Sequence, residues 1–251
     1  MSSHWSRYWE GKTHGEHRYR TEDWLEKYAR EQLFHITSYG AKPCEQSILV
    51  DIGCGAAELT VYYEPFFAKI YAVDSSSSML ETAQRRLDKF ASKKIQLVQS
   101  DALYFAEKID IADVIISNEL AQYLTKEQIS KHLNECLKVL NPKGIIIVSL
   151  IIDPDKYWLW QIGYLRESRI PLLKFIPMLL LNQVRKVYKR IMQQIPSDMG
   201  YSHRKEAIKE ICTSKNLDVE FVNTLYSEYR YTALIRRMTN HRKKQHLARS
   251  R

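Results

Sequence analysis

The strongest constraint on the fold is a stretch where a largely apolar run meets two glycines. The run covers residues 48–52, and Gly53, Cys54 and Gly55 follow it directly. Such a run is typical of a strand in a parallel sheet, because both faces of that sheet are buried. The mixed segment 58–67 then predicts a helix. Strand, glycine turn and helix form a unit in which a nucleotide-like ligand can approach bare backbone; the alternative is a tight turn without a ligand.

A carboxylate before the turn separates this unit from the dinucleotide-binding type. Asp51 lies two residues before the first glycine, and Glu58 stands where a dinucleotide fingerprint has its third glycine. The order Asp51-x-Gly53-x-Gly55 resembles the first motif of class I S-adenosylmethionine (SAM)-dependent methyltransferases. That family usually has one more glycine, where this chain has Ala57. The resemblance implies a SAM site lined by Asp51, Gly53, Cys54 and Gly55.

The second predicted strand, 70–73, ends in another carboxylate, Asp74. A carboxylate at this place can accept hydrogen bonds from both hydroxyls of a ribose. The stretch 73–80 resembles the second cofactor motif of the same family. The resemblance adds Ser75 and Met79 to the predicted cofactor site.

The third predicted strand, 95–98, is followed by Asp101 and Ala102. The resemblance implies that Asp101 accepts a hydrogen bond from the exocyclic amine of adenine. The backbone N–H of Ala102 would then meet a ring nitrogen of the base. The alternative is that Asp101 only caps a short helix over residues 102–108.

The fourth predicted strand, 112–117, ends beside a polar segment. The resemblance implies that this strand end lies next to the transferable methyl group, which adds Asn118 to the cofactor site. Three side chains just beyond it are candidates for binding the acceptor: Glu119, Gln122 and Tyr123.

Methylation of a hydroxyl with a high pKa requires a general base, and histidine is the usual choice near neutral pH. His203 is the candidate for base or substrate anchor, with Tyr201 beside it. The alternative for His203 is a surface histidine in the first turn of a helix. Trp158 completes the predicted acceptor site. If no base is needed, the acceptor is a phenolate, an amine or a stabilised carbon.

Several helix starts carry capping residues. Ser78 with Glu81 and Thr125 with Gln128 both fit the capping box, in which two side chains satisfy the first backbone N–H groups. Ser202 is a candidate cap for a helix over residues 203–213.

The predicted fold is a Rossmann-like, doubly wound α/β sheet. Residues 217–221 and 229–235 alternate in polarity, which predicts two antiparallel strands at the end of a parallel sheet. Class I methyltransferases finish in this way, so the resemblance implies the strand order 3-2-1-4-5-7-6 with strand 7 antiparallel.

We expect four parts along the chain. They are an N-terminal helical lid (1–44), a SAM-binding core (45–152 and 200–237), a helical cap or insertion for substrate (153–199) and a basic flexible tail (238–251).

The lid is rich in aromatic side chains and contains a helix that begins after Thr21. Tyr8, Trp9 and Arg20 are candidates for contact with the cofactor, since helices at this end often close over the cofactor in the resembled family. The alternative is that the aromatic residues pack on the outside of the domain.

The insertion repeats apolar residues at helical spacing, with basic residues on the other face. A cap helix with a solvated face and a helix that meets a lipid-like substrate or an anionic membrane both fit this pattern. The tail is likewise either a solvated segment or an arm for nucleic acid or membrane.

Composition narrows the remaining options. No apolar run approaches the roughly 20 residues that span a bilayer, and the first residues show no signal-peptide core. The four cysteines have neither metal-ligand spacing nor disulfide density, so we expect a cytoplasmic protein with reduced thiols and no metal.

The sequence as a whole predicts an enzyme that moves a methyl group from SAM, leaving S-adenosylhomocysteine (SAH). We expect a small-molecule acceptor, with O-methylation favoured: a natural product, a saccharide or a lipid-like metabolite. An RNA methyltransferase is the alternative that the net charge of +9 suggests. The segment 117–120 lacks the Asn/Asp-Pro-Pro-aromatic pattern common in base amino-methyltransferases, so we expect no nucleic acid partner. A SAM-binding protein without catalysis is the other alternative.

Overall fold

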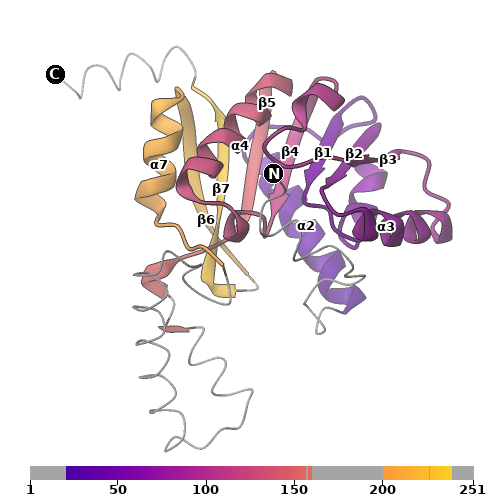
Figure 1. The fold of residues 1–251 in the computed structure, drawn as a ribbon, viewed down its shortest axis with the longest axis horizontal. Coiled ribbons are helices and arrows are strands. Elements are labelled where there is room, and N and C mark those ends of the chain that lie inside the picture. The colour runs from indigo at the N-terminus through magenta and orange to yellow at the C-terminus, as the bar shows by residue number, and fades with distance from the viewer. Residues whose placement is uncertain (1–20, 157, 160–199, 226, 239–251) are drawn as a thin grey trace, which may run out of the picture.

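The computed structural model describes residues 21–156, 158–159, 200–225 and 227–238. Seven strands form one sheet in the order β3-β2-β1-β4-β5-β7-β6 (Figure 1). Neighbouring strands from β3 to β5 pair in parallel, whereas β7 is antiparallel to both β5 and β6. The predicted fold class and strand order are therefore confirmed. The strands are β1 (Ile48–Ile52), β2 (Lys69–Asp74), β3 (Ile95–Gln99), β4 (Ala112–Asn118), β5 (Leu140–Ile152), β6 (Leu217–Thr224) and β7 (Ser227–Arg237).

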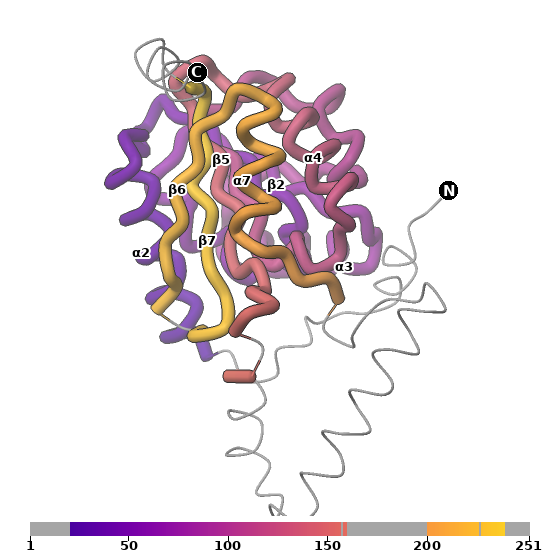
Figure 2. Tube along the Cα trace, turned by 90° about the vertical axis from the view of Figure 1, so that its left-hand side faces the viewer, coloured from indigo at the N-terminus to yellow at the C-terminus, as the bar shows by residue number. Residues whose placement is uncertain are grey.

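Helices cover both faces of the sheet. Figure 2 shows α2 on one side of the strands and α4 and α7 on the other. The helices are α2 (Glu22–Ser38), α3 (Ser77–Lys89), α4 (Lys126–Val139) and α7 (Lys205–Ser214), with short 3-10 helices η1 (Thr60–Phe66), η2 (Ala106–Lys108), η3 (Ala121–Tyr123) and η4 (Pro154–Lys156). This double cover explains why the parallel strands read as apolar runs.

Alternate residues of β1 enter two separate cores. Val50 and Ile52 pack with residues from η2, α4 and α7, whereas Leu49 packs with residues from α2 and η1. Asp51 has the same parity as Leu49, so its carboxylate is directed toward η1. The one acid in this buried strand therefore has a defined face, and its partner there is described below.

Proline limits the element after the glycine turn. The predicted helix 58–67 is the 3-10 helix η1, which contains Pro65. A proline inside a helix removes a hydrogen-bond donor and clashes with the preceding turn, so a regular α-helix is not formed here. The short helix predicted at 102–108 is likewise reduced to η2.

The caps of two helices differ from those predicted. The cap of α3 is Ser76, whose Oγ accepts a hydrogen bond from the backbone N–H of Met79 (3.3 Å), so the box at Ser78 is wrong. Ser76 takes an extended conformation, with φ −86° and ψ 117°. The cap of α3 is therefore two residues earlier in the chain than predicted. The cap position of α7 is Arg204 and not Ser202.

The third capping prediction is confirmed. The Thr125 hydroxyl accepts a hydrogen bond from the N–H of Gln128, and the Gln128 side chain accepts one from the N–H of Thr125. The following helix ends at Val139, and β5 begins directly at Leu140. This strand begins before its apolar run at 145–150, and the pairing of β4 with β5 shifts register between Ala112 and Val114.

Candidate active site

The carboxyl ends of β1, β2, β3 and β4 meet at one edge of the sheet, because these four strands are parallel neighbours. This edge brings together the glycine turn, Asp74, Asp101 and Asn118, which lie up to 65 residues apart in the sequence. Binding sites of doubly wound sheets form at such edges, where the order of the strands reverses.

The glycine turn after β1 is shaped to leave room above it. Gly53 and Gly55 have φ angles of +76° and +54°, which favour glycine. A side chain built on Gly55 would meet nothing within 4 Å. The N–H groups of Gly53 and Cys54 both donate to the Val73 carbonyl, at 2.8 and 3.1 Å, so β2 holds the turn in place.

Asp74 is held in a fixed orientation beside this turn. Its Oδ2 accepts from the N–H of Gly55 and its Oδ1 accepts from the N–H of Ser76, both at 2.9 Å. Burial raises the pKa of Asp74, while hydrogen bonds from the N–H groups of Ser76 and Gly55 oppose that rise. The N–H of Ser75 is a third donor, and a carboxylate has about four lone-pair sites, so capacity remains for a hydroxyl of a ribose.

Asp51 lies beneath the turn and faces away from the open space. Its side chain is 3% exposed, and its Oδ2 accepts from the Thr60 hydroxyl at 2.6 Å. Burial raises the pKa of Asp51 to about 6, against the lowering effect of the Thr60 hydrogen bond and with a further rise from the charge of Asp74. Asp51 thus links η1 to β1. These contacts describe a residue that supports the turn from below.

Asp101 and Ala102 form a short turn after β3. Oδ1 of Asp101 accepts from the N–H of Leu103 at 2.8 Å, although no regular helix follows until Ala106. The carbonyl of Ala102 lies 2.9 Å from Nδ1 of His132 in α4. Of the other predicted cofactor residues, Ser75 is half-buried in the preceding loop, and the buried Met79 packs in the core.

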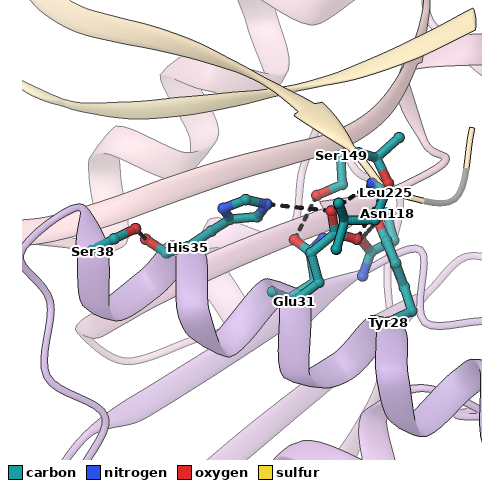
Figure 3. A network of polar contacts seen from close by, with 9 residues as sticks. Tyr28, Glu31, His35, Ser38, Asn118, Ser149 and Leu225 are labelled. Carbon is teal, nitrogen blue, oxygen red and sulfur yellow. Dashed lines mark hydrogen bonds and ion pairs between the residues drawn. The ribbon is translucent and has the colours of Figure 1, made fainter. Parts of the chain in front are cut away.

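Asn118 ends β4 and meets α2. Its Oδ1 accepts from the Tyr28 hydroxyl at 3.2 Å, and its buried Nδ2 has no hydrogen-bond partner among the described residues. Figure 3 shows Tyr28 and Glu31 of α2 directed toward Asn118, Ser149 and Leu225. The helix therefore contacts the strand end at which the methyl group is expected. Tyr8, Trp9 and Arg20 lie outside the described residues.

Beyond Asn118, three predicted acceptor residues meet around an arginine that the sequence did not single out. Arg230 of β7 is 6% exposed, and its Nη1 lies 3.3 Å from Oε1 of Glu119. Nη1 also donates to the Leu150 carbonyl at 3.2 Å, and Nη2 donates to Oε1 of Gln122 at 3.4 Å. The Gln122 amide in turn donates to the Tyr123 hydroxyl at 3.0 Å.

Two residues clamped by Arg230 carry unusual backbone angles. Glu119 and Leu150, at the ends of β4 and β5, have φ values of +54° and +58°. Residues other than glycine pay an energetic cost in this left-handed region, and such positions cluster at functional sites. The cluster therefore combines a buried ion pair with local backbone strain.

The chain returns to the sheet beside this cluster. The N–H of Tyr201 donates to the Gln122 carbonyl at 2.7 Å, and Gly200 packs against the same carbonyl with no room for a side chain. Tyr201 thus joins the predicted acceptor group through its backbone. Trp158 is 55% exposed, and no hydrogen bond ties it to this cluster in the described part of the chain.

His203 is a buried residue, so the surface alternative is wrong. Its side chain is 7% exposed, and its Nε2 lies 3.1 Å from the Ala121 carbonyl. Burial lowers the pKa of His203, against hydrogen bonds to the carbonyls of Ala121 and Leu124. Nε2 must carry a proton to donate to a carbonyl, so this nitrogen is not available to accept one. These contacts describe a brace for η3, and they do not favour the predicted role as general base.

Comparison with known proteins agrees with this geometry. Residues 49–144 match the family model described as "Methyltransferase domain". A magnesium protoporphyrin IX methyltransferase structure from Synechocystis with bound SAH aligns over 92% of this chain and 90% of its own, with a TM-score of 0.58 and 14% identity. The described part of this chain therefore has the fold of the class I SAM-dependent methyltransferases. A SAM-dependent methyltransferase structure from Clostridium acetobutylicum shares this fold, with a TM-score of 0.59, 15% identity and coverage of 86% and 92%.

The curated relatives of this chain are named for different activities. A "Probable S-adenosylmethionine-dependent methyltransferase" of Saccharomyces cerevisiae is 32% identical over 43% of this chain and 36% of its own length. A "Probable cobalt-precorrin-6B C(15)-methyltransferase (decarboxylating)" of Archaeoglobus fulgidus is 24% identical over 51% and 69%. A carboxy-SAM synthase of Cronobacter sakazakii is 32% identical over 41% and 43%. The chain thus spans between 36% and 69% of the length of these relatives.

Proposed function

We propose that this protein transfers a methyl group from SAM to a small-molecule acceptor. The observation that carries the proposal is the edge where four parallel strands end, with Asp74 fixed beside an open glycine turn. The described residues fit the cofactor, because an open turn, an oriented carboxylate and the Asn118 Nδ2, which has no hydrogen-bond partner among them, follow one another along this edge.

In this proposal each strand end contacts one part of the cofactor. Asp74 accepts hydrogen bonds from the ribose, Asp101 and the N–H of Ala102 recognise adenine, and Asn118 lies toward the methyl group. Bound SAM supplies a methyl group that its sulfonium makes electrophilic, and rate enhancement then depends largely on how the acceptor is positioned.

We assign the acceptor to the cluster around Arg230. Glu119 carries a negative charge balanced by the guanidinium, and its side chain is 16% exposed, so it can accept a hydrogen bond from a small molecule. His203 is engaged with a carbonyl, which leaves Glu119 as the group of this cluster best suited to take a proton. A carboxylate is a weak base, so a hydroxyl of low pKa, such as a phenol, is the acceptor that it serves best. O-methylation of such a hydroxyl is the preferred reaction.

The insertion also belongs to the proposal, as a cap over the acceptor. The N–H of Asp153 donates to the Tyr229 carbonyl and the N–H of His203 donates to the Ile152 carbonyl, both at 3.0 Å. The segment between these points therefore leaves and returns beside the Arg230 cluster. Its residues 160–199 lie outside the described part, so contact with a lipid-like acceptor or a membrane remains a proposal, which flotation on anionic liposomes would test. Among the described helices, none has the length and apolar character to cross a bilayer.

Calorimetric titration with SAH tests the cofactor assignment. Wild type should bind, and Asp74→Ala should weaken binding by about 100-fold, because hydrogen bonds to a charged group contribute about 1.5–3 kcal/mol each. Asp110→Ala is the matched control, since Asp110 is an exposed acid whose partners are Tyr71 and Lys69 at the opposite edge of the sheet. Equal affinities for wild type and Asp74→Ala would contradict the assignment.

A further inference from the structure

A buried serine–histidine pair lies next to the cofactor edge and has no part in the function proposed above. Ser117 Oγ and His132 Nε2 are 2.9 Å apart, and the two residues are 0% and 1% exposed. Ser117 immediately precedes Asn118 in β4, and His132 projects from α4. The burial of this pair excludes nucleophilic attack on a substrate, so its contacts indicate a different role.

The hydrogen-bond partners fix which nitrogen of His132 carries the proton. Nδ1 lies 2.9 Å from the carbonyl of Ala102, and a carbonyl can only accept, so Nδ1 is the donor. Nε2 is then free of hydrogen and accepts from the Ser117 hydroxyl. Burial lowers the pKa of His132, against the raising effect of the Ala102 carbonyl, so burial favours the neutral ring, in which Nδ1 donates and Nε2 accepts.

His132 and Asp101 hold the same peptide group from opposite sides. The peptide between Ala102 and Leu103 has its carbonyl bound by Nδ1 of His132 and its N–H bound by Oδ1 of Asp101, at 2.8 Å. Fixing this peptide also fixes the Asp101 carboxylate that bonds to it. The orientation of that carboxylate therefore depends on a helix residue 31 positions later in the chain.

We propose that His132 is a positioning residue for adenine recognition, which makes the site selective for an amino group on the purine. The inference rests on the proposed function, in which Asp101 accepts from the exocyclic amine. A correctly oriented carboxylate attracts an amino group and repels a keto oxygen at the same ring position. Without the His132 bond, the Ala102–Leu103 peptide can rotate and the carboxylate loses its direction.

Two ligands separate this role from a packing role. SAH carries the amino group, and S-inosylhomocysteine carries a keto oxygen in its place. Wild type should prefer SAH by about tenfold to 100-fold, the range expected for a hydrogen bond to a charged group. A residue that only packs would change stability or both affinities together, and would leave their ratio unchanged.

Three variants test the individual bonds. His132→Leu removes the hydrogen bonds of both ring nitrogens. The ratio of the dissociation constants of S-inosylhomocysteine and SAH should then be close to one. His132→Asn keeps an amide donor near the place of Nδ1, so it should retain most of the preference. Ser117→Ala removes the serine bond at Nε2, leaves the contact of Nε2 with Cys136 Sγ at 3.6 Å, and should retain most of the preference as well. Unfolding measured without ligand establishes that each variant is folded, and His132→Gln, whose longer amide reaches toward Ser117, replaces His132→Leu if that variant fails to fold.

The outcomes distinguish the inference from the function beneath it. Wild type that binds neither ligand contradicts the proposed function itself. If wild type prefers SAH and His132→Leu or His132→Gln prefers it equally well, the inference is overturned and the proposed function is not. Equal loss of selectivity in His132→Asn and His132→Leu would also overturn the hydrogen-bond account.

Discussion

The strand ends that we propose for the cofactor (the cofactor edge) and the Arg230 cluster that we propose for the acceptor (the acceptor cluster) are adjacent but are built in different ways. At the cofactor edge, Asp101 bonds to a residue 2 positions away and Asp51 to one 9 positions away. In the acceptor cluster, Arg230 bonds to Glu119 across 111 positions and to Gln122 across 108. The first region takes its geometry from the parallel strands β1 to β4 and the turns that follow them, whereas the second also requires β7 to lie beside β5. The two binding functions should therefore be separable by mutation.

The two regions also differ in how they stabilise buried acids. Neutral donors hold Asp51 and Asp74, and burial raises the pKa of both against the lowering effect of those hydrogen bonds. Glu119 is instead paired with a guanidinium. We therefore expect pH to change the contribution of Asp51, and loss of Arg230 to change that of Glu119.

The largest effect is expected for Arg230→Met. Removing one member of a buried ion pair costs about 3–5 kcal/mol, because the other charge is left uncompensated. Methyl transfer should fall on the order of 100-fold as the acceptor groups lose their positions, while SAH affinity should stay within about twofold. Labelled-methyl incorporation and calorimetry give the two values.

Arg236→Met is the control for this experiment, because Arg236 lies on the same strand and pairs with Asp218 at a partly exposed position. The double variant Arg230→Met/Glu119→Gln should recover stability, since no unpaired charge remains. Loss of SAH binding in Arg230→Met would show that the two regions are not separable.

The next effect is a change of about 3 kcal/mol, across the titration of Asp51, in the free energy of unfolding of Asp51→Asn relative to wild type. The folded-state pKa of Asp51, about 6, lies above its ordinary value of 3.8, so the folded protein holds this proton more tightly. The contribution of Asp51 is therefore favourable below about pH 4 and is lost as the pH rises through about 6. Asparagine does not titrate, so the stability of the variant relative to wild type should increase across this interval. Urea unfolding from about pH 4 to pH 8 measures the difference, and a constant difference would contradict the assignment.

A smaller loss, about 2 kcal/mol, is expected for Glu31→Ala. Glu31 is buried in α2 and accepts from the N–H of Leu225 at 2.9 Å and from the Thr224 hydroxyl at 3.2 Å (Figure 3). The variant should unfold at lower denaturant concentration, and hydrogen exchange at Leu225 should be faster. Glu26→Ala in the same helix removes only an exposed pair with Arg30 and should change stability by less than about 0.5 kcal/mol. Similar losses in both variants would show that α2 is not anchored through Glu31.

The smallest effect, about 1 kcal/mol, is expected for Tyr28→Phe. This variant keeps the ring stacked on Trp24, with centroids 5.0 Å apart, and removes the hydroxyl that donates to Asn118. SAH affinity should fall by about fivefold, because Asn118 loses the bond that orients it. Tyr104→Phe, at an exposed tyrosine, is the control. Unchanged SAH affinity in Tyr28→Phe would remove α2 from the cofactor site.

The separation between the two regions also explains what could be predicted from sequence. Asp74 ends one predicted strand and Asp101 follows the next, so their shared edge follows from parallel pairing. The strand that contains Arg230 was expected from its alternation, but its burial depends on Glu119, 111 positions away. An arginine between two tyrosines in a predicted strand was the only available indication.

Local errors have equally specific causes. Four consecutive serines, 75–78, offer equivalent caps for α3, and only the backbone angles select Ser76. Pro65 was visible in the sequence and accounts for the shortened η1. The burial of His203 could not be read from its neighbours, because its ring packs against η3, about 80 positions earlier.

Transfer of a labelled methyl group is the most direct test of the central claim. Wild type, Asp74→Ala and Arg230→Met would each be incubated with methyl-labelled SAM and a small-molecule extract, and the label in the extract would be measured after removal of protein. We predict incorporation by wild type and strong losses in both variants, with SAH binding lost only in Asp74→Ala. If wild type binds SAH but transfers no label to the extract, the claim that this fold acts here as a small-molecule methyltransferase is contradicted.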